Sequence, residues 1–447
     1  MEHVDTLVIG FGKAGKTLAG ALAKRGQKVA LVERSPQMYG GTCINIACIP
    51  TKALEFKSRH PHATGKTESD YAAAIAAKRE LTTMLRGKNY AKIAGTGAEI
   101  IDGTAAFLSP DVVRVTCADG IIRDITAERI VINTGATSRV GKIAGLEQSK
   151  RLYTSSSIME LDTLPKELVI VGASYIALEF ASIYANFGAH VTVLQRGTTF
   201  LPKADQEIAA QIKADFAARG IRVLEQAQIR SGHEDAEGLT LTLDVAGQTE
   251  QLKADAVLFA IGRRPNTDEL NLAQAGVELD EQGAIKVTNR LQSTNPKVWA
   301  AGDVKGGEQF TYISLDDFRI LLSQFVGDGT RTTDNRGLIP HTVFIDPPYA
   351  SIGMTEEAAR AEGLAIRVSH LPVAGVPKAH ILETPRGLLK LILEEESERI
   401  LGAHFYSPEA HEIIHIVEVA MVAGLSFKVL RNMIFAHPTM AEALNDL

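Results

Sequence analysis

The hydrophobic pattern near the N-terminus predicts a strand, a tight turn, a helix and a second strand. The apolar run 4–9 leads into Gly10-Phe11-Gly12-Lys13-Ala14-Gly15, a helical stretch continues through Lys24, and a second apolar run covers 28–33. Glycines at these positions allow a tight turn, the approach of a pyrophosphate to backbone N–H groups and close helix–strand packing. Glu33 lies 23 residues after Gly10, where a carboxylate accepts hydrogen bonds from ribose hydroxyls. The pattern therefore predicts a dinucleotide-binding βαβ unit.

The same pattern recurs in the second third of the chain. The apolar run 167–171 leads into Gly172-Ala173-Ser174-Tyr175-Ile176-Ala177, a helix and a second strand over 190–195. Gln195 lies 23 residues after Gly172 and so stands where the first copy has Glu33. Two mononucleotide folds in one chain indicate two nucleotide cofactors.

The second copy departs from the pattern where the adenosine ribose would bind. Gln195 replaces the carboxylate and Arg196 follows it directly. Loss of the carboxylate removes repulsion against a 2′-phosphate, and an arginine can pair with that phosphate. We therefore expect NADPH, with NADH as the alternative. Ser174 also replaces the middle glycine, and Ala177 replaces the last one.

The rest of the chain alternates between helical and strand patterns. Residues 53–95 are mostly helical with a break near His60-Pro61-His62, short strands follow from Glu99, and a strand over 296–304 ends in Gly302-Asp303. The fold class predicted is α/β, with two Rossmann-like, doubly wound, three-layer nucleotide-binding domains and a C-terminal α+β domain. The expected boundaries are 1–149 and 268–336 for the first nucleotide domain, 150–267 for the second, and 337–447 for the C-terminal domain.

Composition narrows the class of protein. A chain of 447 residues is too long for one core, and 45% hydrophobic with 22% charged residues is ordinary for a globular protein. A net charge of −6 gives no electrostatic case for nucleic acid, and no apolar run approaches the roughly 20 residues of a membrane span. The chain begins in a strand pattern, without a signal peptide, and its three cysteines cannot build a disulfide framework. We therefore expect a cytoplasmic protein.

Two of the three cysteines, Cys43 and Cys48, lie five positions apart between Gly41 and Pro50. On a regular α-helix this spacing turns the side chains about 140° apart and separates the Cα atoms by about 8–9 Å. A disulfide requires less than about 7 Å, so the two can pair only where the helix start is distorted. Such a bridge would be easy to reduce, as redox-active bridges are. Spacing alone leaves a second interpretation open, in which both are small buried thiols.

Other candidate motifs are weaker. His411-Glu412-Ile413-Ile414-His415 matches the zinc-hydrolase pattern H-E-x-x-H, but it lies in an apolar run and no third ligand is evident. His60 and His62 flank a proline in a polar stretch, which favours a solvated surface. Cys117 lies in a strand pattern and is expected to be an ordinary packed or surface thiol. We predict no metal site.

Taken together, these segments resemble the pyridine nucleotide–disulfide oxidoreductases, the flavoprotein family of glutathione reductase, dihydrolipoyl dehydrogenase and mercuric reductase. The most specific segment runs from Gly40-Gly41-Thr42-Cys43 to Cys48-Ile49-Pro50-Thr51-Lys52. The resemblance implies that the C-terminal domain dimerises. It implies FAD contacts from Gly10, Gly12, Gly15, Glu33, Thr42, Lys52, Thr134, Gly135, Ala136, Gly302, Asp303 and Thr311, and NAD(P)H contacts from Gly172, Ser174, Tyr175, Ile176, Gln195, Arg196 and Gly262.

The resemblance also implies catalytic roles. A hydride would pass from the nicotinamide to the flavin, which would reduce a Cys43–Cys48 bridge, with Cys43 meeting the substrate and Cys48 facing the flavin. Other roles follow from the same likeness: Tyr175 covers the nicotinamide pocket, Glu179 pairs with Lys52, and His437 with Glu442 forms an acid–base pair that reaches the cysteines of the other subunit. A homodimer with a shared active site is therefore implied. Phe435 stands where the family commonly has a further histidine.

Several departures bear on the substrate. Gln195 is unlike the acid of dihydrolipoyl dehydrogenases, Pro50-Thr51-Lys52 is unlike the Pro-Lys-Lys of glutathione reductases, and residues 445–447 hold no cysteine pair like that of mercuric reductases. The run 309–317 resembles the reactive-chlorine-resistance flavoproteins of bacteria. That likeness implies reduction of a small oxidant such as hypothiocyanous acid, or of Cu(II). Four alternatives stay open: a disulfide reductase, a mercuric reductase without the C-terminal cysteines, a diaphorase or NAD(P)H oxidase that uses the flavin alone, and a flavin-binding scaffold or sensor without turnover.

Overall fold

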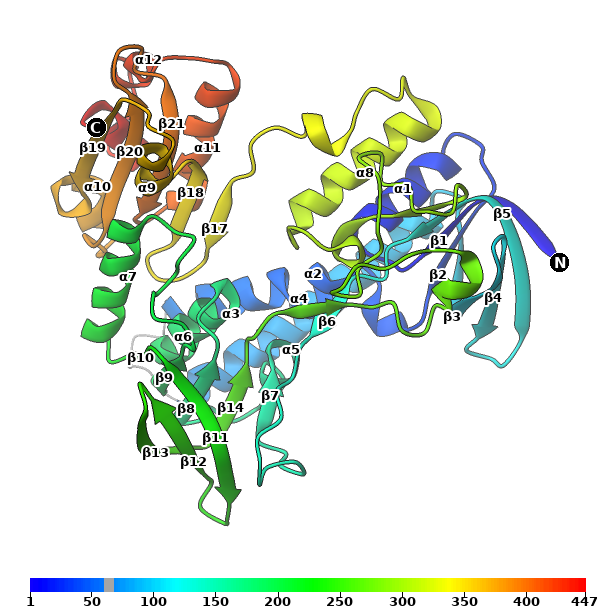
Figure 1. The fold of residues 1–447 in the computed structure, drawn as a ribbon, viewed down its shortest axis with the longest axis horizontal. Coiled ribbons are helices and arrows are strands. Elements are labelled where there is room, and N and C mark those ends of the chain that lie inside the picture. The colour runs from blue at the N-terminus through cyan, green and yellow to red at the C-terminus, as the bar shows by residue number, and fades with distance from the viewer. Residues whose placement is uncertain (60–67) are drawn as a thin grey trace. The chain divides into compact units, whose positions relative to one another are not determined.

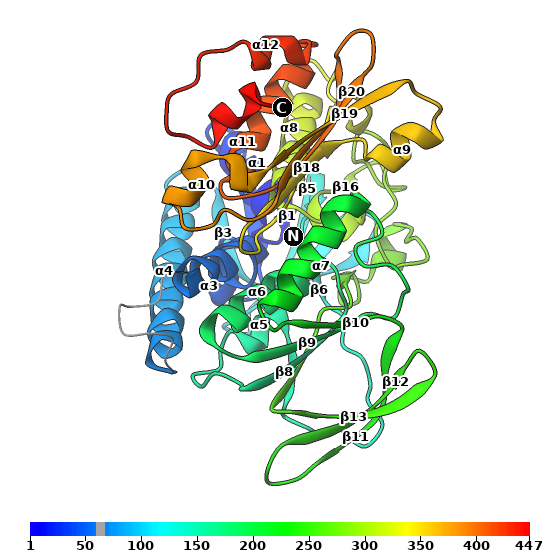
Figure 2. The same ribbon diagram turned by 90° about the vertical axis from the view of Figure 1, so that its left-hand side faces the viewer.

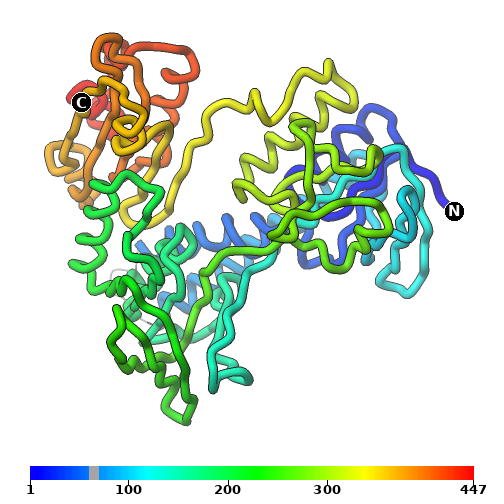
Figure 3. The backbone as a smooth tube through the Cα atoms, in the orientation of Figure 1, coloured from blue at the N-terminus to red at the C-terminus, as the bar shows by residue number. Residues whose placement is uncertain are grey.

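The computed structural model describes residues 1–59 and 68–447, which form two compact units. The first unit comprises 1–53, 75–139 and 262–336, and the second comprises 54–74, 140–261 and 337–447. The chain therefore passes between the units five times, and its path can be followed in Figure 3. The predicted domain boundaries at residues 149/150, 267/268 and 336/337 stay a prediction.

The first unit is built on a parallel sheet with the strand order β3-β2-β1-β5-β16. Helices α1 and α8 pack on one face of this sheet (Figure 1). Val8, Leu31 and Val131 belong to the core on that face. Successive side chains of a strand point to opposite faces, so Leu7 and Ile130 enter the core on the other side. The elements are β1 (Glu2–Ile9), α1 (Lys13–Ala23), β2 (Val29–Glu33), α2 (Thr42–Asn45), β3 (Glu99–Ser109), β5 (Ile122–Ile132), β6 (Ala136–Ser138), β15 (Arg263–Pro265), β16 (Val298–Ala300) and α8 (Thr311–Val326). Helices α3 (Cys48–Arg59) and α4 (Glu68–Ala94) belong to both units, because residues 54–74 are part of the second.

The second covering layer of this sheet is antiparallel rather than helical. Strands β3 and β5 extend beyond the parallel region and enclose β4 (Val112–Cys117) in a three-stranded meander. Phe107, Val113 and Val115 of these strands fill the core on that face. The predicted Rossmann-like layers are confirmed. One difference is that antiparallel strands, rather than helices, cover one face of the parallel sheet. Cys117 ends β4 and is partly packed against the same core, as expected.

The second unit repeats the architecture. Its parallel sheet has the order β10-β9-β8-β14-β7, with helix α6 packed on β8 and β9 (Figure 2). A separate antiparallel sheet, β11-β12-β13, contributes Leu241 and Leu243 to the core on the opposite face, against Val169 and Val257. The elements are β7 (Leu152–Thr154), β8 (Glu167–Val171), α6 (Tyr175–Phe187), β9 (His190–Leu194), α7 (Gln206–Ala218), β10 (Arg222–Leu224), β11 (Ala227–Glu234), β12 (Leu239–Val245), β13 (Gln248–Ala254) and β14 (Ala256–Phe259).

The C-terminal segment of the second unit forms an antiparallel sheet, β17-β18-β21-β20-β19, with helix α11 packed on β18 and β21. This is the predicted α+β domain. Its elements are β17 (His341–Val343), β18 (Tyr349–Gly353), α9 (Glu356–Ala361), β19 (Ile366–Pro372), α10 (Pro377–Ile381), β20 (Leu388–Glu394), β21 (Ile400–Tyr406), α11 (Ala410–Val422) and α12 (Phe427–Arg431). Across the described ranges of the chain, no helix combines the length and the hydropathy that a membrane span needs.

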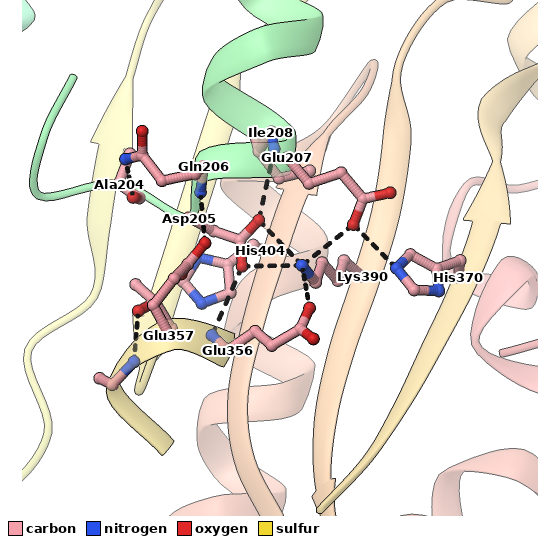
Figure 4. Close-up of polar contacts among 12 residues, drawn as sticks. Ala204, Asp205, Gln206, Glu207, Ile208, Glu356, Glu357, His370, Lys390 and His404 are labelled. Atoms are coloured by element: carbon pink, nitrogen blue, oxygen red, sulfur yellow. Dashed lines mark hydrogen bonds and ion pairs between the residues drawn. The ribbon is translucent and has the colours of Figure 1, made fainter. Parts of the chain in front are cut away.

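A buried lysine joins the C-terminal sheet to helix α7. Lys390 of β20 is 1% exposed, and its Nζ lies 2.9 Å from Asp205 Oδ2, 3.0 Å from Glu207 Oε2 and 2.7 Å from Glu356 Oε2 (Figure 4). Asp205 caps α7 by accepting a hydrogen bond from the backbone N–H of Ile208. Burial lowers the pKa of Lys390, but its hydrogen bonds to the three carboxylates outweigh burial and raise that pKa above its ordinary value. One ammonium therefore holds three carboxylates of two other elements.

Replacement of Lys390 by methionine should lower the free energy of unfolding by about 3–5 kcal/mol, because it leaves buried carboxylates without a counter-charge. The hydrogen bond from Lys390 lowers the pKa of Glu356 below its ordinary 4.5. The stability from that carboxylate is therefore present above pH 4.5 and disappears as the pH falls through the folded-state value. Denaturant unfolding of wild type and Lys390→Met should thus differ at pH 7 and converge in acid. The exposed Lys428→Met serves as the control and should match wild type at both pH values. A difference that persists unchanged in acid would contradict the ion-pair account.

Candidate active site

The Gly-rich turn after β1 leaves no room for side chains. A Cβ on Gly10 would collide with the backbone oxygen of Asn133, and one on Gly12 would collide with the Asn133 side chain. Gly10 also has φ +103°, which favours glycine. A Cβ on Gly15 would lie 2.8 Å from Val8 Cγ1. The turn is therefore a bare backbone cradle at the N-terminus of α1, the geometry that suits a pyrophosphate.

Glu33 closes this cradle at the end of β2. It is 8% exposed, and its carboxylate accepts hydrogen bonds from the backbone N–H of Phe11 (3.0 Å) and of Ser35 (3.1 Å). Burial raises the pKa of Glu33 in spite of these bonds. A nearly buried acid beside the glycines is positioned to accept hydrogen bonds from ribose hydroxyls.

Two polar residues that the sequence did not single out hold the cradle in shape. Asn133 Oδ1 accepts a hydrogen bond from the Gly15 N–H (2.9 Å), and its Nδ2 donates to Ala301 O (2.6 Å). Ser314 Oγ of α8 accepts from the Ala14 N–H at 3.2 Å. These bonds tie the Gly-rich turn to the Ala301-Gly302-Asp303 run and to α8.

The remaining predicted FAD residues gather in the same unit. Asp303 is partly buried, and this desolvation raises its pKa, while the charge of Arg263 opposes the rise. Thr134 Oγ1 donates to Asn266 O at 2.7 Å, and the Asn266 N–H donates to Gly135 O at 2.9 Å. The run 134–136 is thereby joined to the strand β15. In the first unit lie Gly10, Gly12, Gly15, Glu33, Thr42, Cys43, Cys48, Lys52, Thr134, Gly135, Ala136, Gly262, Gly302, Asp303 and Thr311.

The helix that carries the two cysteines is broken between them. Helix α2 ends at Asn45, Ile46 has φ −140°, and α3 begins at Cys48 itself. Cys43 and Cys48 are both thiols in the structure, and their side chains share a hydrogen bond. The distortion that the sequence required is therefore present, and it brings together two sulfurs that a regular helix would keep apart.

The surroundings of the sulfurs affect their protonation. Cys48 Sγ lies 3.3 Å from the hydroxyl of Thr311, the first residue of α8. The hydrogen bond with Cys48, followed by burial, raises the pKa of Cys43, while Thr311 and Lys16 act in the opposite direction. The shared hydrogen bond and burial therefore disfavour ionisation of Cys43 in the reduced pair.

The cysteine segment packs directly on the cradle. A Cβ on Gly41 would lie 2.7 Å from Gly12 Cα, and a Cβ on Gly135 would lie 3.7 Å from Thr42 Oγ1. A bare backbone turn, a buried acid and a pair of thiols thus lie in one unit, with Gly41 packed on Gly12. These residues fit a flavin dinucleotide, whose pyrophosphate and ribose the turn and Glu33 would hold.

The second Gly-rich turn has a similar form. Gly172 has φ +109°, and a Cβ there would collide with Ala260 O. Ser174, which replaces the middle glycine, is exposed at the N-cap of α6 and leaves the helix N-terminus without a side-chain cap. The turn retains the open N–H groups that a second dinucleotide needs.

Gln195 and Arg196 differ in their surroundings. Gln195 is buried, and its Nε2 donates to Thr199 O, so the side chain supports its own loop. Its Oε1 is buried and has no hydrogen-bond partner. Arg196 is exposed. An accessible cation therefore stands after the end of β9, where the adenosine ribose of a dinucleotide binds.

Two predicted catalytic residues of the second unit, Tyr175 and Glu179, lie on α6. The Glu179 carboxylate accepts a hydrogen bond from the Phe344 N–H at 3.0 Å, and the ring of Tyr175 lies edge-on to His341 at 6.4 Å between centroids. The predicted pairing of Glu179 with Lys52 concerns residues of different units and stays a prediction. In the second unit lie Gly172, Ser174, Tyr175, Ile176, Glu179, Gln195, Arg196, His437 and Glu442.

His437 and Glu442 form the expected pair near the C-terminus. His437 Nδ1 donates to Glu442 Oε2 at 2.8 Å, and the carboxylate also accepts from the Thr439 N–H at 3.2 Å. The bond from His437 lowers the pKa of Glu442, so the ionised carboxylate orients the ring. His437 itself is exposed, which leaves its Nε2 available to another group.

The two histidines of the zinc-like motif contact other side chains. The Nδ1 of His415 pairs with Glu418 at 2.6 Å, and His411 lies beside the ring of Phe344. Within residues 1–59 and 68–447, no group of three or more His, Cys, Asp or Glu side chains is arranged to hold a metal ion. His60 and His62 lie outside the described residues.

Comparisons with known proteins agree with this geometry. A family profile described as pyridine nucleotide-disulphide oxidoreductase matches residues 4–317, and that of its dimerisation domain matches residues 339–447. The chain is 43% identical over 449 residues to the probable pyridine nucleotide-disulfide oxidoreductase RclA of Escherichia coli, covering 100% of this chain and 99% of that protein. It is 32% identical to a mercuric reductase of Lysinibacillus sphaericus (99% of this chain, 82% of that protein).

Similarity extends to dihydrolipoyl dehydrogenases and to solved structures. The Geobacillus stearothermophilus dihydrolipoyl dehydrogenase is 33% identical, covering 98% of this chain and 94% of that protein. The Cu(II) complex of the HOCl-induced flavoprotein disulfide reductase RclA of E. coli superposes with a TM-score of 0.95 at 42% identity, covering 100% of this chain and 99% of that one.

Proposed function

Because the chain belongs to the pyridine nucleotide-disulphide oxidoreductase family, we propose that it transfers electrons from NADPH through FAD and a Cys43–Cys48 disulfide to a small reactive-chlorine-type oxidant. The family is FAD-dependent and takes its electrons from NAD(P)H. The observation that carries the proposal is the broken helix, which brings the two sulfurs into a shared hydrogen bond beside the Gly-rich cradle.

Each group of the site has a task in this reaction. When bound, FAD accepts a hydride from the nicotinamide and delivers two electrons to the disulfide. Cys48 is the sulfur beside Thr311, at 3.3 Å from its hydroxyl. Cys43 keeps a proton that must leave before this sulfur attacks an oxidant. His437, oriented by Glu442, is the base that would take that proton, from the second subunit of a dimer.

The chemistry of the pair suits hypothiocyanous acid. The Cys43 thiolate attacks the electrophilic sulfur and releases hydroxide, which takes up a proton to become water. The second sulfur then displaces thiocyanate, and the disulfide closes. Two thiols and one hypothiocyanous acid thus give one disulfide, thiocyanate, water and a proton. The E. coli relative is described as HOCl-induced, which supports this class of oxidant.

Cu(II) is the second candidate oxidant. Thiolates are soft donors that suit copper, and the E. coli relative was solved as a Cu(II) complex. Reduction of a disulfide substrate or of Hg(II) is the alternative, supported by the dihydrolipoyl dehydrogenase and mercuric reductase relatives.

A homodimer completes the proposed site. The dimerisation-domain profile covers residues 339–447. The surface of this segment carries large apolar side chains, with Val419 at 67%, Val422 at 72% and Ile434 at 100% exposure. Large exposed apolar side chains of this kind favour a protein interface, and a second copy of the chain is the partner that the family implies.

Replacement of Cys43 by serine should abolish oxidant reduction while leaving flavin reduction intact. We expect kcat/KM for hypothiocyanous acid to fall by about a hundredfold or more, since the attacking sulfur is lost. Steady-state NADPH oxidation and rapid bleaching of the flavin band measure the two steps separately. Cys117→Ser, on β4, is the matched control and should behave as wild type. Undiminished turnover of Cys43→Ser would instead identify a diaphorase or oxidase that uses the flavin alone.

Replacement of Arg196 by methionine should weaken NADPH use selectively. Loss of a charge-assisted contact to the 2′-phosphate should lower kcat/KM for NADPH by about tenfold or more, with NADH little changed. Lys166 is exposed and directly precedes β8, at the end of that strand opposite to the Gly-rich turn. Lys166→Met therefore serves as the control. An equal loss with both nucleotides, or no loss with either, would be inconsistent with an arginine that reads the phosphate.

A further inference from the structure

Lys16 is a buried cation beside the cysteine segment. It follows Gly15 on the first turn of α1 and is 7% exposed. Its Nζ donates to Gly40 O at 3.2 Å and to Asn89 Oδ1 at 2.5 Å. Both acceptors are neutral, and the described part of the chain gives this ammonium no carboxylate partner. A buried ammonium without a counter-charge is costly, so its retention calls for a negative charge that arises in function.

The bond to Gly40 holds this charge on the segment that carries Cys43. Gly40 lies three residues before Cys43, and its carbonyl fixes the ammonium at the start of α2. The positive charge of Lys16 favours the Cys43 thiolate, and Cys43 in turn favours protonated Lys16. Burial, followed by repulsion from Lys13, lowers the pKa of Lys16 to about 8, so the cation is mostly present at neutral pH.

The two sulfurs face different cations. Cys48 interacts with Arg263, a partly buried guanidinium that also interacts with Asp303, whereas Cys43 interacts with Lys16. Reduction of the disulfide takes up two electrons and one proton and yields one thiol and one thiolate. The hydrogen bond shared with Cys48, followed by burial, disfavours the negative charge on Cys43, the sulfur that meets the oxidant. A cation on the Cys43 side opposes that bias.

We propose that Lys16 is a positioning residue that stabilises the thiolate of Cys43 and thereby makes this sulfur the nucleophile of the reduced pair. The proposal deepens the function proposed above and rests on it. Other charged groups near α2 act differently. Lys13 and Lys92 repel Lys16, and Arg86 of α4 donates to Asn45 Oδ1 (2.9 Å) at the far end of α2.

The test is the pH dependence of Cys43 alkylation in the holoenzyme. Wild type, Lys16→Met and Lys16→Gln are reduced with dithiothreitol and treated with iodoacetamide from pH 5 to pH 10. Peptide mass spectrometry follows Cys43 and Cys48 separately. Methionine retains the apolar stem without a donor, whereas glutamine keeps a neutral donor for Gly40 O. Both variants should alkylate Cys43 about tenfold more slowly at pH 7, with the profile moved to higher pH. The exposed Lys92→Met is the control and should keep the wild-type profile.

Three results would overturn the proposal. One is a wild-type profile in Lys16→Met. Another is a wild-type profile in Lys16→Gln alone, because the hydrogen bond would then matter and the charge would not. The third is loss of bound FAD from the variants, measured by the ratio of flavin to protein absorbance, which would make Lys16 a cofactor contact. Dithiothreitol opens the pair without NADPH, so this test still reports on Lys16 if the proposed electron transfer is wrong.

Discussion

The break in the helix between Asn45 and Cys48 is the constraint on which the proposed chemistry depends. A continuous helix would hold Cys43 and Cys48 about 8–9 Å apart at Cα and point their side chains in different directions. Ending α2 at Asn45 and restarting at Cys48 brings the sulfurs into a hydrogen bond. A disulfide in this place can open and close with little movement of the backbone, as an electron relay requires.

The rest of the first unit supports that break. Gly41 packs on Gly12 with no room for a side chain, Asn45 accepts a hydrogen bond from Arg86, and the Gly-rich turn is fixed by Asn133. Backbone contacts therefore connect the cysteines to the nucleotide cradle. A shift of the cysteine segment or of the Gly-rich turn would move the sulfurs relative to a bound flavin. This constraint accounts for the small residues and the buried amides of this region.

The sequence predicted the features whose determinants are local. Both Gly-rich turns, the acid Glu33 at the end of β2 and the need for a distorted helix at Cys43 follow from spacing along a few residues. It did not predict Asn133, Ser314, Arg263 or Lys16 as parts of the site, because their partners are neighbours only after folding. Asn133 reaches Gly15 across 118 positions, and Ser314 reaches Ala14 across 300. Nor does spacing reveal that Gln195 turns its amide into its own loop.

The most direct test of the account is a count of thiols at residues 43 and 48 before and after addition of NADPH without oxygen. Differential alkylation with light and heavy reagents, read by mass spectrometry, measures each cysteine separately. The account predicts that both are blocked in the air-oxidised holoenzyme and that both become reactive once NADPH is added, with Cys117 unchanged. Equal labelling of Cys43 and Cys48 before and after NADPH would contradict it.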